Sequence, residues 1–352
     1  MTDFIALLKK MLSASGLSGF EDPIREIIHE AWTPLTDELS VSKIGSLHGL
    51  KMGRGEAPRR RVLISAHMDA IGMMVTAIEG GLMRVTEIGG LDHRILPGQL
   101  VTVHGREALP GVVVQPPAHL LPESAGEGPV EMKYLFVDVG LRPAAVAEKV
   151  RIGDTVSYAQ EPLELTGEAL AGHSLDNRVS VAATTLCLQE LQTRMHDWDV
   201  WAVASAQEEE TLGGALTSPF DIRPDIAIVI DVCFAKSTGS NDWSSIPFGE
   251  GVGLGYGPNI HPALYAAFEE KAKALEIPYH RDLMPKMSGT DAMAIQVVAE
   301  GIPCMVLGIP LRYMHTPVET VSLKDIRRAG RLMAAFIADL TPDALDKIQW
   351  EE

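Results

Sequence analysis

Continuous apolar runs alternate with helical patterns along this chain. Runs typical of strands covered on both faces occur at 62–64, 200–204, 226–230 and 303–309. Apolar residues at helical spacing predict helices over 3–11, 22–32, 177–191, 262–275 and 322–340. Ser322 and Asp325 have the spacing of a capping box, so we expect the Ser322 side chain to cap the last helix. The alternation predicts an α/β domain with a mixed, mostly parallel sheet flanked by helices.

The pattern changes between residues 72 and 162. Helical periodicity is weak there, and Gly and Pro separate short strand-like pieces at 82–88, 100–104, 111–115, 134–139 and 155–158. Such spacing is typical of a small β-barrel or sandwich. We therefore predict that residues 72–162 form a β domain inserted into an α/β domain made of residues 1–71 and 163–352.

Length and charge narrow the possible classes of function. With 352 residues, 46% of them hydrophobic, the chain can bury the cores of two domains. Its net charge of −17 disfavours nucleic-acid partners and anionic membrane surfaces, because both attract clusters of Lys and Arg. The same charge suits a metal-binding protein or a substrate with a positive end.

The cysteines and the N-terminus bear on the cellular compartment. The three cysteines, Cys187, Cys233 and Cys304, are far apart and lie in apolar surroundings. We expect buried free thiols rather than a disulfide framework or a thiolate zinc site. The first residues lack the basic start and long apolar core of a signal peptide, and no apolar run reaches the ~18 residues of a membrane span. These features predict a cytoplasmic protein.

Metal-capable side chains gather where the predicted strands end. Seven of them lie at strand ends, before a helix or just after the last strand: His67, Asp69, Asp176, Glu208, Glu209, Asp231 and His315. In open α/β sheets the carboxyl ends of the strands form the edge where ligands bind. Imidazole and carboxylate donors together suit two borderline divalent metal ions. Two ions ~3.5–4 Å apart, bridged by one carboxylate, polarise a carbonyl and lower the pKa of a shared water.

The pair Glu208-Glu209 offers two roles from neighbouring positions. At the end of an extended strand, the two side chains are expected to point to opposite sides of the backbone. One carboxylate can then bind metal while the other takes a proton and passes it to a leaving amine. Asp69, two residues after His67, is expected on the same side as that imidazole, which it can orient. For an isolated Glu triplet, a solvated acidic loop is the alternative.

Taken together, these residues resemble the M42 di-metal aminopeptidases, the group of glutamyl and tetrahedral aminopeptidases in which some members carry an endoglucanase label. The resemblance extends from residue 65 to residue 319 and covers most of the chain. It rests on Ser65-Ala66-His67-Met68-Asp69 with Ile71-Gly72, Leu175-Asp176-Asn177-Arg178, Gln207-Glu208-Glu209, Gly213-Gly214-Ala215, Ile230-Asp231-Val232, Gly289-Thr290-Asp291-Ala292 and His315-Thr316-Pro317-Val318-Glu319.

The resemblance implies a metal-dependent aminopeptidase that removes N-terminal residues from short peptides. It implies two divalent ions per chain, zinc or cobalt by expectation, with manganese as a further fit. The implied ligands are Asp176 as the bridge, His67 and Asp231 in one site, and Glu209 and His315 in the other.

Further roles follow from the same resemblance. Glu208 would be the general acid/base, and Asp69 would orient His67. Thr290 and Asp291 would contribute to substrate binding. The inserted β domain resembles the family's dimerisation domain, which implies homodimers that build a hollow tetrahedral dodecamer.

Two positions depart from the family pattern. Gly172-His173-Ser174 replaces a segment where family members often carry Lys-Ala, so the entrance to the site is expected to differ. Glu210 stands where the family often has an apolar residue, and the motifs assign no role to it.

Three other readings compete with an aminopeptidase. A metal-independent glycosidase needs two carboxyls ~5–10 Å apart around a sugar, which leaves both histidines without a role. A deacylase or carboxypeptidase on the same scaffold needs a basic residue to bind a carboxylate, and the candidates are Arg178 and Arg312. A catalytically idle shell protein would use metals only for assembly, and it would not need Glu208.

Overall fold

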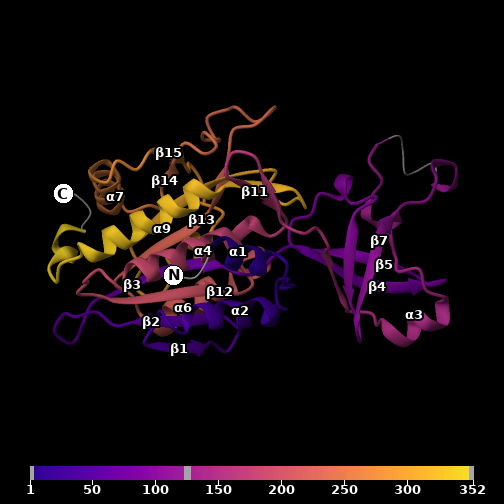
Figure 1. Ribbon diagram of the computed structural model, residues 1–352, viewed down its shortest axis with the longest axis horizontal. Coiled ribbons are helices and arrows are strands. Elements are labelled where there is room, and N and C mark those ends of the chain that lie inside the picture. Colours follow the sequence, from indigo (N-terminus) through magenta and orange to yellow (C-terminus); the bar gives the residue numbers. More distant parts are fainter. Residues whose placement is uncertain (1–3, 123–127, 349–352) are drawn as a thin grey trace.

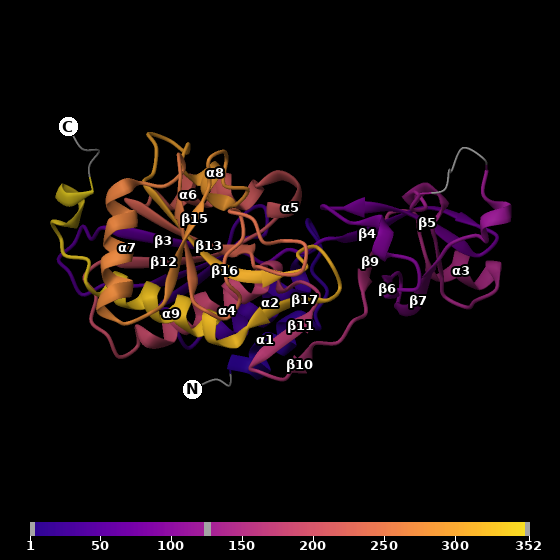
Figure 2. The same ribbon diagram turned by 90° about the horizontal axis from the view of Figure 1, so that it is seen from above.

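An α/β body carries a β-barrel at one end of an elongated molecule (Figure 1; Figure 2). The structure is a computed structural model that describes residues 4–122 and 128–348. In these residues no helix combines the length and the hydropathy that a membrane span requires. The three cysteines are buried and free, as predicted.

Four parallel strands form the centre of an eleven-stranded sheet in the body. In their order across the sheet they are β12 (Asp199–Ser205), β3 (Arg61–His67), β13 (Ile226–Phe234) and β16 (Cys304–Arg312). The outer strands are β1 (Glu38–Val41), β2 (Leu47–Lys51), β17 (Glu319–Ser322), β11 (Ala169–Gly172), β10 (Leu163–Leu165), β14 (Val252–Tyr256) and β15 (Tyr279–Leu283). The mixed sheet is confirmed, and its parallel pairing is concentrated at the centre, where helices cover both faces and favour continuous apolar runs.

Helices cover both faces of this sheet (Figure 2). One face carries α1 (Phe4–Leu12), α2 (Asp22–Trp32), α4 (Leu175–Glu190), α7 (Pro262–Ala274) and α9 (Leu323–Ala338). The other face carries α6 (Gly213–Ile222) and α8 (Asp291–Ile295). All five helices predicted from apolar spacing are present, because each has buried apolar residues to place against the sheet or the neighbouring helices.

The start of α9 differs from the prediction. Ser322 is the N-cap residue, but its side chain makes no capping hydrogen bond. The Asp325 carboxylate instead accepts hydrogen bonds from Gly251 N (3.1 Å) and Arg328 Nη1 (2.7 Å). The capping box is therefore wrong, because tertiary contacts with the segment before β14 engage Asp325.

A closed barrel occupies the inserted segment, with a core separate from that of the body. Around the barrel, the strands follow the order β4 (Gly72–Glu79), β5 (Leu82–Ile88), β8 (Phe136–Asp138), β7 (Ala108–Val114), β6 (Leu100–His104) and β9 (Thr155–Tyr158). Sequence patterns did not predict β4 or the short helix α3 (Pro143–Lys149). The helix buries only Val146, so it has no periodic stripe to detect. Short 3-10 helices lie at 93–95, 118–120, 132–134 and 344–347.

Candidate metal centre and active site

The carboxyl edge of the central strands brings the predicted site residues together. His67 is the last residue of β3 and pairs with Ser205, the last residue of β12. Asp231 was predicted at the end of its strand, but β13 continues to Phe234 because it stays paired with β16. Its side chain still faces His67, with Asp231 Oδ1 3.8 Å from His67 Nε2.

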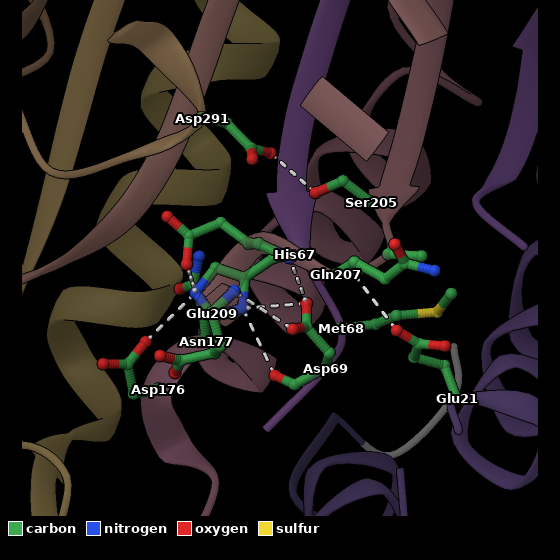
Figure 3. Close-up of polar contacts among 12 residues, drawn as sticks. Glu21, His67, Met68, Asp69, Asp176, Asn177, Ser205, Gln207, Glu209 and Asp291 are labelled. Carbon is green, nitrogen blue, oxygen red and sulfur yellow. Dashed lines mark hydrogen bonds and ion pairs between the residues drawn. The ribbon is translucent and has the colours of Figure 1, made fainter. Parts of the chain in front are cut away.

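Asp176 lies between two histidines that are far apart in the sequence. Its Oδ1 is 3.2 Å from His67 Nε2, and its Oδ2 is 3.4 Å from His315 Nε2. Figure 3 shows Asp176 reaching the His67 ring from the start of α4. One carboxylate thus presents a separate oxygen to each imidazole, which is the arrangement required of a bridging ligand.

Two groups of side chains around Asp176 could each hold a metal ion. One comprises His67, Asp176 and Asp231, and the other Asp176, Glu209 and His315, whose Nε2 is 3.7 Å from Glu209 Oε2. Within each group the donor atoms lie within 4.8 Å of one another. Nitrogen and oxygen ligands bind zinc at ~2.0–2.2 Å, so an ion fits between donors at these separations. A third group, His67 with Glu208 and Glu209, overlaps the first two.

The electrostatics of the cluster favour cations. Burial raises the pKa of Glu208 to about 7 and the pKa of Glu209 to about 8, and it raises the pKa of Asp231 well above its usual range. The hydrogen bond to Asp176 raises the pKa of His315 to about 9. In the described residues, the ion pairs of these carboxylates involve the two histidines and no Lys or Arg. Divalent cations would relieve this excess of buried negative charge.

Glu208 and Glu209 do not stand on an extended strand end, as the sequence predicted. They begin a helical turn, α5 (Glu208–Thr211), which follows Gln207 in a left-handed conformation with φ 60°. Neighbouring side chains on such a turn diverge by ~100° rather than by the 180° of a strand. The carboxylates still reach different partners, because Glu208 Oε2 is 3.7 Å from His67 Nε2 whereas Glu209 approaches His315.

Two buried acids hold the backbone of this turn. The carboxylate of Asp69 accepts N–H groups from Glu208 (3.0 Å) and Glu209 (3.2 Å). Glu21 Oε1 accepts the N–H of Gln207 at 3.0 Å (Figure 3). The His67 ring is fixed from the same side, since its Nδ1 is 3.2 Å from the Asp69 carbonyl oxygen and 3.5 Å from Asp69 Oδ1. Asp69 therefore positions both an imidazole and the two glutamates.

Glu319 is a positioning residue that the sequence reasoning did not identify as part of the site. Its Oε2 accepts the N–H of Asp176 (3.1 Å), and its Oε1 accepts the N–H of His315 (2.8 Å). One buried carboxylate thus fixes the backbone of two proposed ligands. Its place at the end of the His315 motif was the available signal.

The inserted segment also touches the cluster, through the loop that follows β5. Gly90 O lies 2.8 Å from His315 Nδ1, and the N–H of Gly89 donates to Glu210 Oε1 at 2.6 Å. A Cβ on residue 90 would lie only 3.0 Å from His315 Nδ1, so a glycine allows this close approach. Glu210, to which the motifs assigned no role, therefore connects the active-site turn to the barrel segment.

His173 lies at the junction of barrel and body rather than among the metal-capable groups. It is buried beside Tyr158 of β9, with Nδ1 2.7 Å from Ser174 Oγ. Burial lowers its pKa to about 3, so the ring is neutral at physiological pH. This histidine helps to line a small hollow that also contacts Asp176 and Glu319.

A cavity of about 570 Å³ opens from the acidic cluster and is lined by Thr290 among others. Asp291, the neighbouring predicted substrate contact, does not line it. Asp291 Oδ2 instead accepts hydrogen bonds from Ser65 and Ser205, each at 2.6 Å, beneath β3 and β12 (Figure 3 shows the Ser205 contact). A direct contact between Asp291 and substrate is therefore not supported by this burial.

The two arginines considered for binding a substrate carboxylate are engaged elsewhere. The guanidinium of Arg178 is buried and donates to backbone oxygens of Met11 and Ala14 at 2.6 and 2.7 Å. Arg312 donates to Lys236 O at 2.9 Å and lies over the ring of Phe248. Neither is among the residues that line the cavity.

Comparison with known proteins identifies the family. The sequence profile of M42 glutamyl aminopeptidases matches residues 45–332. A lysyl aminopeptidase of Pyrococcus furiosus is 34% identical over 344 residues, which cover 96% of this chain and 97% of that protein. The chain belongs to the M42 family. It is accordingly a peptidase, in a family whose named relatives are aminopeptidases.

Solved structures of M42 relatives share the whole fold. A TET aminopeptidase from a marine sediment Thaumarchaeota archaeon has a TM-score of 0.92 at 29% identity, covering 98% of this chain and 99% of that one. The TET1 peptidase of Pyrococcus horikoshii has a TM-score of 0.84 at 28% identity, covering 96% and 100%. That peptidase is described as assembling into a tetrahedron or a large octahedral shell.

Proposed function

We propose that this M42 protein is a di-metal aminopeptidase with Glu208 as its general acid/base. The observation that carries the proposal is Asp176, which offers one oxygen to each half of the cluster. His67 and Asp231 would complete one metal site, and Glu209 and His315 the other. Zinc or cobalt fits these donors, and manganese fits the carboxylates.

The residues of the chain divide the chemistry among them. Bound at the two sites, divalent ions would polarise the scissile carbonyl and lower the pKa of a water. Glu208 takes a proton in the first step and passes it to the leaving amine in the second. Burial raises the pKa of the Glu208 carboxyl to about 7. A carboxyl with such a pKa is suited to both proton transfers near neutral pH. Asp69 holds the backbone of Glu208 and the His67 ring in the required orientation.

The negative charge of the site also indicates the class of substrate. The acidic cluster attracts the free amino group of a peptide, whereas it repels a C-terminal carboxylate. Arg178 and Arg312, the two candidates for binding that carboxylate in a carboxypeptidase, are both engaged elsewhere. Short peptides with a free N-terminus are therefore the proposed substrates.

We further propose that the barrel mediates homodimers and that these can build a larger shell. Its surface exposes several large hydrophobic side chains, namely Leu100, Leu120, Leu141 and Ile152. The shells described for the Pyrococcus horikoshii relative support assembly. Light scattering on the wild-type protein should give at least a dimer, and a monomer would refute this part of the proposal. The free buried cysteines fit the proposed cytoplasmic location.

The test of function combines chelation with a panel of substrates. The protein is treated with EDTA, dialysed, reloaded with zinc, cobalt or manganese, and assayed on aminoacyl-4-nitroanilides and their N-acetylated forms. We expect activity only with metal and only on free N-termini. Activity on acetylated substrates would indicate a deacylase, and full activity after EDTA would refute the metal dependence.

Elemental analysis of Asp176→Ala tests the bridging ligand separately. The variant should lose most bound metal and nearly all activity, because the change removes one ligand from both sites. Two metals per chain in this variant would refute the bridging role.

A further inference from the structure

The cavity extends along the sheet from the acidic cluster to a buried carboxylate on β15. Asp282 is 7% exposed and lines the same cavity as Asp231. Its strand is separated from β13 by β16 and β14, but its side chain reaches back across two glycines. A Cβ on Gly308 would lie 3.4 Å from Asp282 Oδ2, and one on Gly253 would lie 3.4 Å from Asp282 Cβ. The glycines therefore provide the floor on which the Asp282 side chain lies.

One long amino-acid side chain can span the distance between this carboxylate and the proposed metal centre. The same Cβ on Gly308 would be 2.8 Å from Cys233 Sγ, so Asp282 and Cys233 meet above Gly308. Cys233 follows Asp231 by two residues on β13 and shares its face of the sheet. Two residues of extended strand span about 7 Å. A four-carbon side chain that starts near Asp231 covers that distance.

The charge of Asp282 has no partner in the described part of the chain. Its carboxylate makes no hydrogen bond or ion pair there, and burial alone raises its pKa to about 6. The group is therefore mostly ionised at neutral pH. Buried carboxylates elsewhere in the α/β body do have donors, as the serine hydroxyls at Asp291 and the backbone N–H groups at Glu319 show. An isolated buried charge is unfavourable, so a carboxylate facing a cavity points to a cation supplied by the ligand.

The cavity that contains both the acidic cluster and Asp282 has largely apolar walls. Phe234, Met284 and Met287 line the cavity and can contact the methylene groups of a long side chain. Lys286 also lines it but is exposed, so its charge is better screened by water than that of Asp282.

We propose that Asp282 is the specificity-determining residue that selects peptides with lysine or arginine at the first position. This inference rests on the aminopeptidase function proposed above. The peptide amino group would lie at the acidic cluster, the methylene stem along the apolar walls, and the terminal cation against Asp282.

Paired substrates test the selection directly. The metal-loaded full chain is assayed on lysyl, arginyl, norleucyl and glutamyl 4-nitroanilides, where norleucine keeps the carbon chain of lysine but lacks its charge. Wild-type kcat/KM should favour lysine over norleucine by ~10²-fold, and Asp282→Asn should bring that ratio close to one, as expected for loss of a buried charge pair. The arginyl substrate shows whether a guanidinium is accepted as well as an ammonium.

A matched control separates the buried charge from general attraction of cations. Asp242 is an exposed carboxylate on the loop beside Trp243, which lines the cavity mouth. Asp242→Asn removes the same charge and should change the lysine-to-norleucine ratio by less than ~2-fold, because exposed charges are screened.

A binding measurement gives an independent readout. Calorimetry should show tighter binding of L-lysine than of L-norleucine to the wild-type protein, and this difference should be lost in Asp282→Asn. The melting temperature of that variant should not fall, since the change removes an unpartnered charge, whereas a purely structural role would lower it. A wild-type ratio near one, an unchanged ratio in Asp282→Asn or a preference for glutamate overturns the inference. Turnover without lysine preference overturns only this inference, whereas turnover of no aminoacyl substrate with any metal overturns the proposed function.

Discussion

At the scale of single residues, Glu208 is the group that separates a catalyst from a metal-binding scaffold. Its carboxylate lies 3.7 Å from His67 Nε2 and belongs to one of the three groups that could hold an ion. Position alone therefore allows both a ligand and a base. A substitution by glutamine distinguishes the two roles, because its amide keeps the shape of the glutamate side chain but cannot take up a proton.

Glu208→Gln is the substitution that distinguishes these roles. We expect the fold and both metals to be retained while kcat falls by ~10²–10⁴-fold with little change in KM, since general acid–base catalysis contributes about that much. Steady-state kinetics with elemental analysis of the same preparation checks this. Loss of metal in proportion to activity would instead make Glu208 a ligand, and Glu209 would become the better candidate for the base.

Glu319 offers a second prediction at this scale. Glutamine at this position keeps one acceptor oxygen, so only one of the N–H groups of Asp176 and His315 stays paired. Glu319→Gln should weaken metal affinity by ~10–100-fold, as changes behind metal ligands do, without unfolding the protein. Competition with a chelator measures the affinity, and circular dichroism controls for the fold. Wild-type affinity in this variant would show that Glu319 does not position the ligands.

The sequence identified the side chains that could bind metal, but it did not identify all the residues that position them. His67, Asp176, Asp231 and His315 were found because imidazoles and carboxylates at strand ends indicate metal binding. Glu319 was missed because its role depends on which backbone N–H groups lie beside it. Tertiary packing determines that neighbourhood, and no local pattern records it.

At the scale of elements, the turn α5 and the loop after β5 bring the body and the barrel segment together. The sequence predicted a strand end at Glu208-Glu209 because an apolar run precedes the pair. The chain turns instead, since Glu21 and Asp69 accept the three consecutive N–H groups of residues 207–209. The helices and the central strands could be predicted from the spacing of apolar residues. This turn could not, because it depends on side chains ~140–190 residues away in the sequence.

The loop contact makes a prediction about Glu210. Glu210→Ala removes the acceptor for Gly89 N and loosens the loop whose Gly90 oxygen faces His315. We expect the metal site containing His315 to lose affinity by ~10-fold. Glu210→Gln is the matched control, because its amide oxygen can still accept the hydrogen bond and should preserve most of the affinity. Stepwise chelation of the two metals measures the effect, and equal behaviour of the two variants would contradict it.

At the scale of the whole molecule, we expect the acidic cluster to couple stability to pH and to metal. The folded-state pKa values of Glu208 and Glu209, about 7 and about 8, exceed the ~4.3 of an unfolded glutamate. A carboxyl with a raised folded-state pKa contributes stability that is present below ~4.3 and is lost as pH rises through the folded-state value. The metal-free protein should therefore lose stability between about pH 5 and about pH 8.

Thermal melting of the metal-free protein across this pH range tests the coupling. The melting temperature should fall with rising pH, and added metal should restore it most at the alkaline end, where the carboxylates are deprotonated. Glu209→Gln should flatten the decline, because one raised carboxyl is gone. A slope equal to that of the wild type would show that Glu209 does not contribute.

Glu319 follows all the other site residues along the sequence, which has a consequence for biosynthesis. The N–H groups that it fixes belong to residues 176 and 315, so the cluster has its full support only after residue 319 has been made. A nascent chain on the ribosome would expose His67 and Asp69 long before their late partners emerge. A chain that stops before residue 319 lacks the support of both proposed ligand segments, so we expect such a chain to bind metal more weakly.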